Sequence, residues 1–190
     1  MLIAVVGLNG SGKDTVANYI ATKFGYKHVS LSNIVRDIVR EQGKDPSDRD
    51  NLNSIADEQR KLVGPNFLAK KALVNYSLKD KLVLSSFRHP AEIEVVKEKK
   101  GVVLRIDVPL EVRFARTALR KKQNPNTDHG SVEIEDFIEK EKRELSNPDK
   151  DKMQINEVLK LADFIIKNDS TLASLYKKID NFMQILPVQE

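Results

Sequence analysis

The sequence predicts a single three-layer α/β domain in which helices cover both faces of a five-stranded parallel sheet. Two observations lead to this prediction. Short apolar runs alternate with helical patterns along the chain, and a glycine-rich loop joins the first apolar run to the first helical pattern. The length of 190 residues suits one domain with a full core, so we expect residues 1–190 to form one unit without a linker.

Each predicted strand is followed by a predicted helix. The expected strands are Leu2–Val6, Lys27–Val29, Leu82–Leu84, Val102–Val108 and Phe164–Ile166, and the helices after them span 16–24, 33–42, 90–99, 110–122 and 171–184. The first helix carries Val16, Ile20 and Phe24 on one apolar stripe and ends at Gly25. Because ligands of such sheets bind at the carboxyl ends of the strands, the loops after the strands are expected to surround one site.

Two insertions interrupt this alternation. The first, about 30–80, is nearly all helical in pattern and is expected to bind an acceptor. The second, about 121–147, is polar at first and then helical, and is expected to form a lid. The stretch 123–130 is rich in helix breakers, as a mobile lid loop would be.

The loop over residues 7–15 reads GLNGSGKDT and has the context of a phosphate-binding loop. Its glycines let several backbone N–H groups point at one anion, and the following helix adds its positive end. Lys13 can reach the outer phosphates of a nucleoside triphosphate. An ordinary glycine-rich turn is the alternative, but the glycines, the lysine and both flanking elements favour a P-loop NTPase fold. The residues expected to bind ATP here are Gly7, Asn9, Gly10, Ser11, Gly12, Lys13, Asp14 and Thr15.

The predicted magnesium ligands depart from the usual pattern. Asp14 follows the loop lysine where Ser or Thr is usual, and Thr15 comes one residue later. The third strand ends in Ser85 rather than in the Asp that usually holds Mg²⁺. One account is an exchange of roles between carboxylate and hydroxyl, with Asp14, Thr15 and Ser85 as ligands; the alternative is that Asp14 only caps the helix.

Arginines gather on one face of the predicted helix 110–122. Arg113, Arg116 and Arg120 are spaced three and four residues apart, so their charges repel unless an anion compensates. A clamp on the phosphates of ATP is one interpretation. The other is a solvated face paired with Glu111 and with acids of the next helix.

A second set of arginines comes from three separate segments. Arg36 and Arg60 lie on predicted helices of the first insertion, and Arg88 directly follows the third strand. Together they could bind the phosphate of an acceptor, although each alone is also typical of a surface arginine.

Composition limits the classes of function. The net charge of +4 combines 32 basic with 28 acidic residues, and the basic excess concentrates at 113–122, which indicates a local anion site rather than a nucleic-acid track. Cysteine is absent, which excludes disulfides and thiol catalysis. No apolar run approaches membrane-spanning length. We therefore expect a cytoplasmic protein, a monomer or homodimer, whose partner is a small molecule rather than a membrane or nucleic acid.

The chain resembles nucleoside monophosphate kinases, and more closely the archaeal adenylate kinase-related proteins, which also look like dephospho-CoA kinases. The resemblance covers nearly the whole chain. Besides the loop it rests on the segments 31–36, 60–65, 87–94, 108–116, 142–145 and 162–170. It implies that the loop around Asn168 lies against the adenine. Asn33 and Ser85 stand where relatives have Asp, which affects the expected metal arrangement but not the fold.

These observations together predict a kinase that uses ATP and Mg²⁺ and phosphorylates a small phosphorylated acceptor. Lys13 and the loop amides would hold the outer phosphates, and the acceptor would be bound by Arg36, Arg60 and Arg88. The arginines Arg113, Arg116 and Arg143 would neutralise charge when the lid closes. A (deoxy)nucleoside monophosphate is the first acceptor expected, and dephospho-CoA the second. A slow ATPase that acts as a switch or assembly factor is the alternative of another class.

Overall fold

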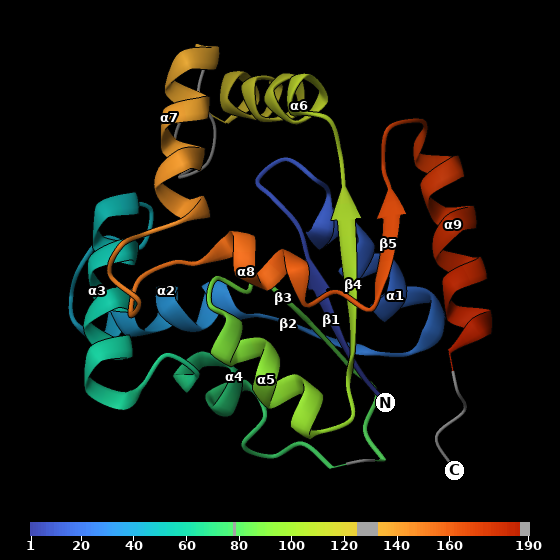
Figure 1. Cartoon of the computed structure of the whole chain (residues 1–190), viewed down its shortest axis with the longest axis horizontal. Helices are drawn as coiled ribbons and strands as arrows, with labels where there is room; N and C mark the ends of the chain where they lie inside the picture. The colour runs from blue at the N-terminus through green and yellow to red at the C-terminus, as the bar shows by residue number, and fades with distance from the viewer. Residues whose placement is uncertain (78, 125–132, 187–190) are drawn as a thin grey trace.

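The computed structural model describes residues 1–77, 79–124 and 133–186. Five parallel strands form one sheet in the order β2-β3-β1-β4-β5. They are β1 (Leu2–Val6), β2 (Lys27–Ser30), β3 (Leu82–Ser85), β4 (Val102–Asp107) and β5 (Phe164–Lys167). Helices cover both faces of the sheet (Figure 1). The predicted fold class is confirmed, and each strand ends within one residue of its predicted boundary.

The helices also follow the predicted pattern. They are α1 (Lys13–Phe24), α2 (Leu31–Glu41), α3 (Arg49–Val63), α4 (Phe67–Ala72), α5 (Pro90–Glu98), α6 (Leu110–Gln123), α7 (Ile134–Leu145), α8 (Ile155–Lys160) and α9 (Leu172–Ile185). Helix α1 begins at Lys13, earlier than predicted, because Gly12 leads directly from the loop into its first turn. The segment between β2 and β3 contains α2, α3 and α4, as its helical pattern indicates.

The core has two parts, one on each face of the sheet. In β1 the side chains of Leu2, Ala4 and Val6 face α2 to α5 and α8, whereas Ile3 and Val5 face α1 and α9. All five are almost fully buried. This continuous apolar strand is typical of a central parallel strand that is covered on both faces, and it fixes the loop that follows.

The carboxyl edge of the sheet is the floor of the candidate site. Ser30 and Ser85 are paired in register at the ends of β2 and β3. Helices α6 and α7 lie beyond this edge, at the top of Figure 1. Of the predicted lid loop, residues 125–130 lie outside the described residues. Throughout the described ranges, no helix has the length and apolar character that a membrane span requires.

Candidate active site

The glycine-rich loop curls tightly between β1 and α1 because two of its glycines have backbone conformations that other residues adopt at a cost. Gly10 has φ +79° and Gly12 has φ +86°. A Cβ atom on Gly10 would lie 2.6 Å from the carbonyl oxygen of Arg113, and one on Gly12 would lie 2.7 Å from Nδ2 of Asn168. The loop is therefore held closely against α6 and against the segment after β5.

We expect Gly10→Ala to destabilise the protein by more than Gly25→Ala. Both glycines have positive φ, which costs a residue with a Cβ about 1–2 kcal/mol. Nothing lies within 4 Å of a Cβ at Gly25, whereas Gly10 would meet the backbone of α6. Urea unfolding of the two variants measures the difference. Equal losses of stability would show that the loop is not packed against α6.

The back of the loop is fastened by side chains that the sequence predicted to contact nucleotide. Nδ2 of Asn168 donates to the carbonyl of Ser11 at 2.8 Å, and Nη2 of Arg116 donates to the carbonyl of Asn168 at 3.1 Å. Arg113 is nearly buried, donates to the carbonyl of Val108 and forms an ion pair with Glu141 of α7. The pair with Glu141 matches the alternative interpretation of the arginine face, in which acids of the next helix compensate its charge.

In front of the loop lies an open cleft of about 340 Å³. Cationic side chains from four elements or their ends line it: Lys13, Arg36, Arg88 and Arg120. Its remaining lining is polar: Asn9, Gly10, Gly12, Asp14, Thr15, Asn18, His28, Ser30, Ser32, Asn33 and Ser86. The predicted donor loop and two of the three predicted acceptor arginines thus share one cavity.

Lys13 shares the cleft with three arginines, so its charge is surrounded by other positive charges. Partial burial, helped by the positive charges of Arg88 and Arg120, lowers the pKa of Lys13 to about 8 against the opposing effect of Asp14 and Glu144. Within the described part of the chain, no carboxylate forms an ion pair with Lys13. Such an arrangement is unfavourable without an anion, so the cleft is suited to a polyanionic ligand.

We expect the affinity for metal-free ATP to fall as the pH rises above 8. The triphosphate favours the charged lysine, and below pH 8 Lys13 already carries its proton, so pH has little effect there through this group. Above pH 8 the free lysine is neutral and binding must take up a proton, which weakens affinity by up to tenfold per pH unit. Calorimetric titration in chelator between pH 7.5 and 9.5 measures this slope. Lys13→Ala should lack it, and an identical slope in that variant would contradict the assignment.

A chain of hydrogen bonds connects the loop carboxylate to the end of β3. The hydroxyl of Ser85 donates to Oδ1 of Asp14 at 2.9 Å, and Nε2 of His28 lies 3.0 Å from the same hydroxyl. Nδ1 of His28 lies 2.7 Å from Oδ1 of Asn18. Gly12 is the N-cap residue of α1, and the Asp14 carboxylate faces the strand. The loop carboxylate and the strand hydroxyl that were predicted to exchange roles as metal ligands therefore lie side by side.

The oxygen donors at this position suit a hard divalent cation. Asp14 and Thr15 line the cleft, and Ser85 contacts Asp14. Among the described residues, no group of three or more His, Cys, Asp or Glu side chains could hold a metal ion by itself. Mg²⁺ usually takes one or two carboxylates plus the phosphates of its substrate, and this donor set fits that mode.

Arg36 is directed into the cleft by a row of serines. Its Nη1 donates to the hydroxyl of Ser32 at 3.0 Å; Ser32 bonds Ser30, and Ser30 bonds Ser86. Ser86 has φ +70°, which is uncommon for a residue with a side chain. Strain of this kind persists where the surrounding structure enforces it, and it often marks a functional site.

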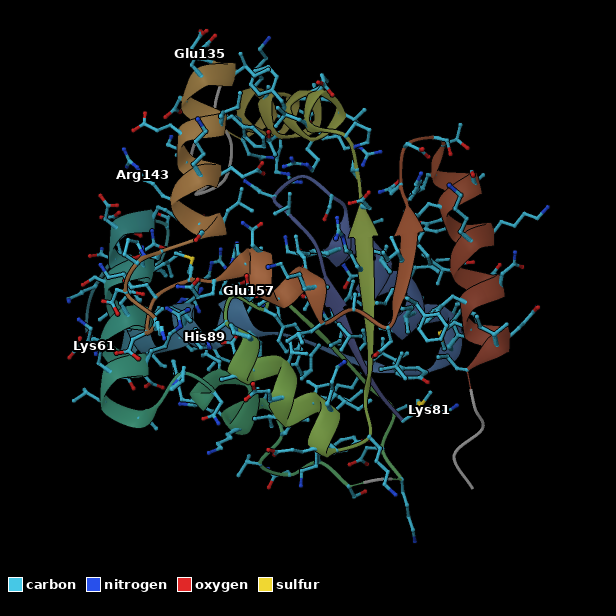
Figure 2. The ribbon with its side chains drawn as sticks, viewed as in Figure 1. Lys61, Lys81, His89, Glu135, Arg143 and Glu157 are labelled. Carbon is cyan, nitrogen blue, oxygen red and sulfur yellow. The ribbon has the colours of Figure 1, made fainter. Side chains whose placement is uncertain are left out.

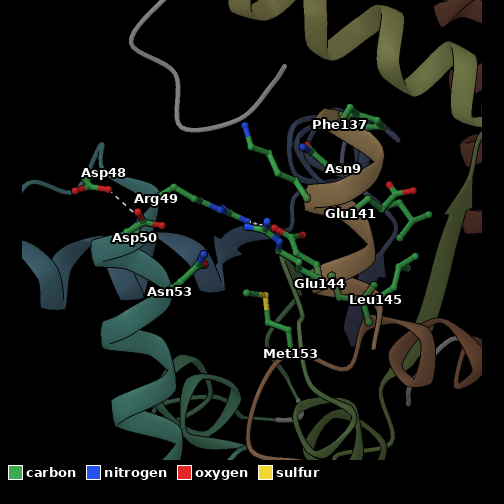
Figure 3. A pocket seen from close by; sticks show the side chains of 14 residues that line it. Asn9, Asp48, Arg49, Asp50, Asn53, Phe137, Glu141, Glu144, Leu145 and Met153 are labelled. Atoms are coloured by element: carbon green, nitrogen blue, oxygen red, sulfur yellow. Dashed lines mark hydrogen bonds and ion pairs between the residues drawn. The ribbon is translucent and has the colours of Figure 1, made fainter. Parts of the chain in front are cut away.

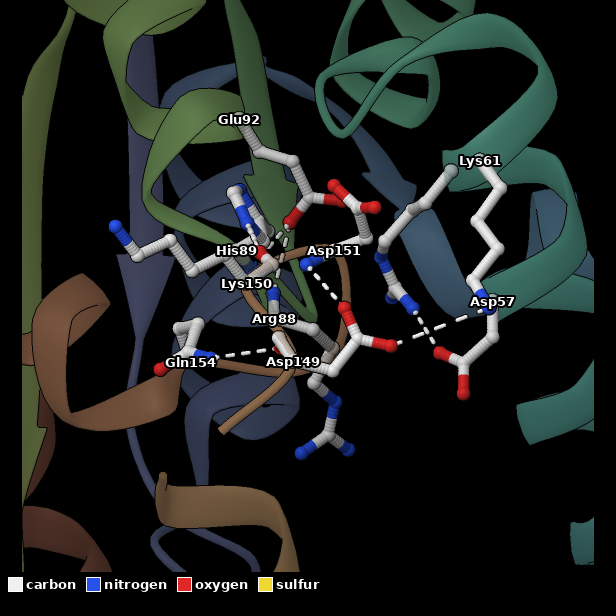
Figure 4. A network of polar contacts seen from close by, with 10 residues as sticks. Asp57, Lys61, Arg88, His89, Glu92, Asp149, Lys150, Asp151 and Gln154 are labelled. Carbon is white, nitrogen blue, oxygen red and sulfur yellow. Dashed lines mark hydrogen bonds and ion pairs between the residues drawn. The ribbon is translucent and has the colours of Figure 1, made fainter. Parts of the chain in front are cut away.

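Arg88 is held by its backbone from two sides (Figure 4). Its N–H donates to Glu92 at 2.8 Å, and its carbonyl accepts from the N–H of Gln154 at 2.9 Å. Glu92 also accepts from the N–H of His89, which caps α5. Burial raises the pKa of Glu92, and the charge of Arg60 opposes that rise. The Arg88 side chain is left directed toward α7, where Nη1 donates to Oε2 of Glu144 at 2.7 Å.

The other predicted site arginines lie outside this cleft. Arg60 is buried, donates to Asp57 at 2.8 Å, and lines a small neighbouring pocket together with Arg88. Arg143 projects from α7 into solvent, with 72% of its side chain exposed, and pairs with Glu139 (Figure 2). Arg113 donates to the carbonyl of Asn9 in the loop, and Arg116 donates to Asn168, which in turn bonds the loop at Ser11.

Some residues of the site could not be singled out from the sequence. Arg120 is an exception, because its helical spacing already placed it on the predicted arginine face. Arg49, His28 and Glu144 carry no local pattern that indicates a site. Arg49 meets Glu144, and His28 meets Ser85, only because segments that are distant in the sequence pack together.

Comparison with known proteins places the chain in a family and confirms its fold. A family model described as an AAA domain matches residues 6–135. A UPF0200 protein of Thermococcus sibiricus is 29% identical over 198 residues, which is 100% of this chain and 97% of that protein.

Solved structures of shikimate kinases have the same fold. The enzyme of Acinetobacter baumannii, in complex with shikimate, has a TM-score of 0.59 and 19% identity, covering 99% of this chain and 95% of the other. That of Aquifex aeolicus has a TM-score of 0.57 and 15% identity, covering 97% and 96%. At such identities the likeness shows the fold alone.

Proposed function

The chain belongs to the AAA-domain family, and we propose that it is an ATP-dependent kinase that phosphorylates a small phosphorylated acceptor, with a (deoxy)nucleoside monophosphate as first choice. One observation carries the proposal. Lys13 of the phosphate-binding loop lines the same cleft as Arg36 and Arg88, which come from different segments. A loop that only binds ATP has no need of acceptor-side cations, whereas phosphoryl transfer requires both anions to be held close together.

The proposed roles follow from position in the cleft. The loop amides and Lys13 bind the β- and γ-phosphates, and Arg36 and Arg88 bind the acceptor's phosphate. Arg120 reaches the cleft from α6 and neutralises charge on the transferring group. Arg113, Arg116 and Asn168 hold the loop in place, while the buried Arg60, which pairs with Asp57, supports the acceptor side. Arg143, although exposed, lines a second cavity next to α7 rather than the cleft itself. Catalysis rests on positioning and on positive charge.

Mg²⁺ is the proposed cofactor. Asp14 and Thr15 would hold it beside the loop, with Ser85 orienting the carboxylate of Asp14. When bound, the ion neutralises charge on the β- and γ-phosphates.

A coupled assay of ADP release tests the function. The acceptor panel comprises nucleoside monophosphates, deoxynucleoside monophosphates, dephospho-CoA and shikimate, together with a sample without acceptor. We expect a monophosphate to stimulate ADP release strongly. Stimulation only by dephospho-CoA, or only by shikimate, would move the chain to another acceptor class. A slow rate that no acceptor changes would refute the kinase proposal.

We expect Arg88→Ala to lower kcat/KM for the acceptor on the order of a hundredfold, with little effect on the affinity for ATP. Arg88 lines both the cleft and the neighbouring acceptor-side pocket. Steady-state kinetics and nucleotide titration separate the two effects. Arg40→Ala, an exposed arginine of α2, is the control. Lost ATP affinity with an unchanged acceptor KM would place Arg88 on the donor side.

A second candidate function is favoured by one feature, the serine at the end of β3. A strand that ends in Ser85 lacks the usual carboxylate for the metal, which would suit a slow ATPase acting as a switch or assembly factor. The sample without acceptor in the same assay distinguishes the two functions.

A further inference from the structure

One carboxylate of α7 bridges two arginines at the acceptor side of the site. Glu144, in the last turn of α7, accepts from Nη2 of Arg49 through Oε1 and from Nη1 of Arg88 through Oε2, the latter at 2.7 Å. Arg49 begins α3 and Arg88 follows β3, so the two cations come from separate parts of the chain. Only 28%, 12% and 18% of the side chains of Arg49, Arg88 and Glu144 are exposed.

The bridge lies beside a larger pocket. A cavity of about 360 Å³ opens between α3 and α7, and Arg49, Asn53 and Glu144 are among the residues that line it (Figure 3). Arg88 lines the cleft of the phosphate-binding loop, which shares Asn9 with this cavity. The bridged carboxylate is thus situated between the space beside the loop and a space large enough for the body of a small acceptor.

We propose that Arg49 adds to the arginines already assigned to the acceptor's phosphate, Arg36 and Arg88. The part of this anion subsite between Arg49 and Arg88 is occupied by Glu144 in this structure, and Glu144 leaves it when the acceptor binds. The proposal rests on the proposed function for the identity of the phosphate's carrier, but the subsite itself is a binding property. A guanidinium pair that holds both oxygens of one carboxylate has the geometry to hold two oxygens of a phosphate.

The exchange favours a phosphate over a carboxylate. A monocarboxylate would only exchange one carboxylate for another, so its binding would gain little free energy. A phosphate dianion brings more negative charge to Arg49, Arg88 and the nearby Lys13, and its binding gains more. Glu144 already borders the open cavity, so its side chain can turn into water without opening the core. Its release would also loosen α7 from α3, while Glu141 still holds α7 to Arg113. Glu141 and Glu144 lie one turn apart near the carboxyl end of α7, so the ion pair with Arg113 would keep this end of the helix attached after the acceptor binds.

Titration with inorganic phosphate, in the presence of saturating MgADP to fill the loop, tests the subsite by calorimetry. We expect Glu144→Gln to bind phosphate about tenfold more tightly than the parent, because the competing charge is gone. Glu135→Gln removes the same charge from the exposed first turn of α7 and should bind phosphate as the parent does. In Glu144→Gln combined with Arg49→Ala, the gain should disappear.

Equal or weaker phosphate binding by Glu144→Gln would overturn the proposal, as would an equal gain in Glu135→Gln. If Glu144→Gln does not fold, as judged by circular dichroism, Arg49→Ala alone decides: phosphate affinity should fall several-fold while MgADP affinity is unchanged, and unaltered phosphate affinity would refute the subsite. The titration needs no turnover. If the phosphate affinities are as expected but the protein phosphorylates nothing in the acceptor panel, the proposed function is refuted and the anion subsite is still supported.

Discussion

Replacing Lys13 with alanine is expected to lower the rate of phosphoryl transfer by a factor of a hundred to a thousand, about 3–4 kcal/mol of transition-state stabilisation, without weakening the fold. Lys13 is the lysine of the phosphate-binding loop, and it lines the cleft together with Arg36, Arg88 and Arg120. The lowered pKa of Lys13 shows that its charge is unfavourable in the ligand-free protein. Its removal should therefore leave the free energy of unfolding unchanged or raised at pH 7.

The measurements are the coupled ADP-release rate, nucleotide titration and thermal unfolding of the variant and parent. Lys71→Ala, on the exposed face of α4, is the control for loss of a lysine. Lys13→Arg distinguishes the effect of the positive charge from the effect of the side chain's shape, because arginine keeps the charge on a larger head group. A variant Lys13→Ala that turns over ATP at the parental rate would show that the loop does not hold the donor.

The parts of the fold that the sequence predicted correctly are those with a local cause. The run Leu2–Val6 is apolar throughout because β1 is buried on both faces, and the loop after it needs glycines at positive φ. Arg36 and Arg88 were predicted to converge because both follow strands that end at the same sheet edge. Each of these inferences requires only one segment and the rule that parallel strands end together.

The parts that the sequence could not provide depend on contacts between distant segments. The spacing of α6 predicts that Arg113 and Arg120 share a face, but not that Arg113 is buried against Glu141 while Arg120 reaches the cleft. Arg60 has the same local pattern as a surface arginine, yet its side chain is buried and pairs with a partly exposed Asp57. Nothing near Glu144 in the sequence indicates that it meets Arg49 and Arg88, since that depends on how α7 packs.

Asp14→Ser is expected to change the metal dependence of nucleotide binding and to lower activity strongly. If the Asp14 carboxylate helps hold Mg²⁺, it lies near the triphosphate and repels it when the metal is removed. The variant should therefore bind metal-free ATP more tightly than the parent. It should also lose most of the affinity that Mg²⁺ adds, because the hydroxyl of Ser85, which donates to Asp14, cannot supply a negative charge.

The structure separates this role from that of a helix cap. Gly12 is the N-cap residue of α1, and the Asp14 carboxylate is bonded to Ser85 of β3, which in turn contacts His28. Serine caps a helix as well as aspartate does, so a capping role predicts that Asp14→Ser changes little. Asp14→Asn is the matched comparison, since it keeps the shape and loses the charge. Titrations of ATP with and without Mg²⁺ decide between the two roles: if parent and both variants show the same metal dependence, Asp14 does not hold the metal, and its carboxylate serves only to join the loop to the end of β3.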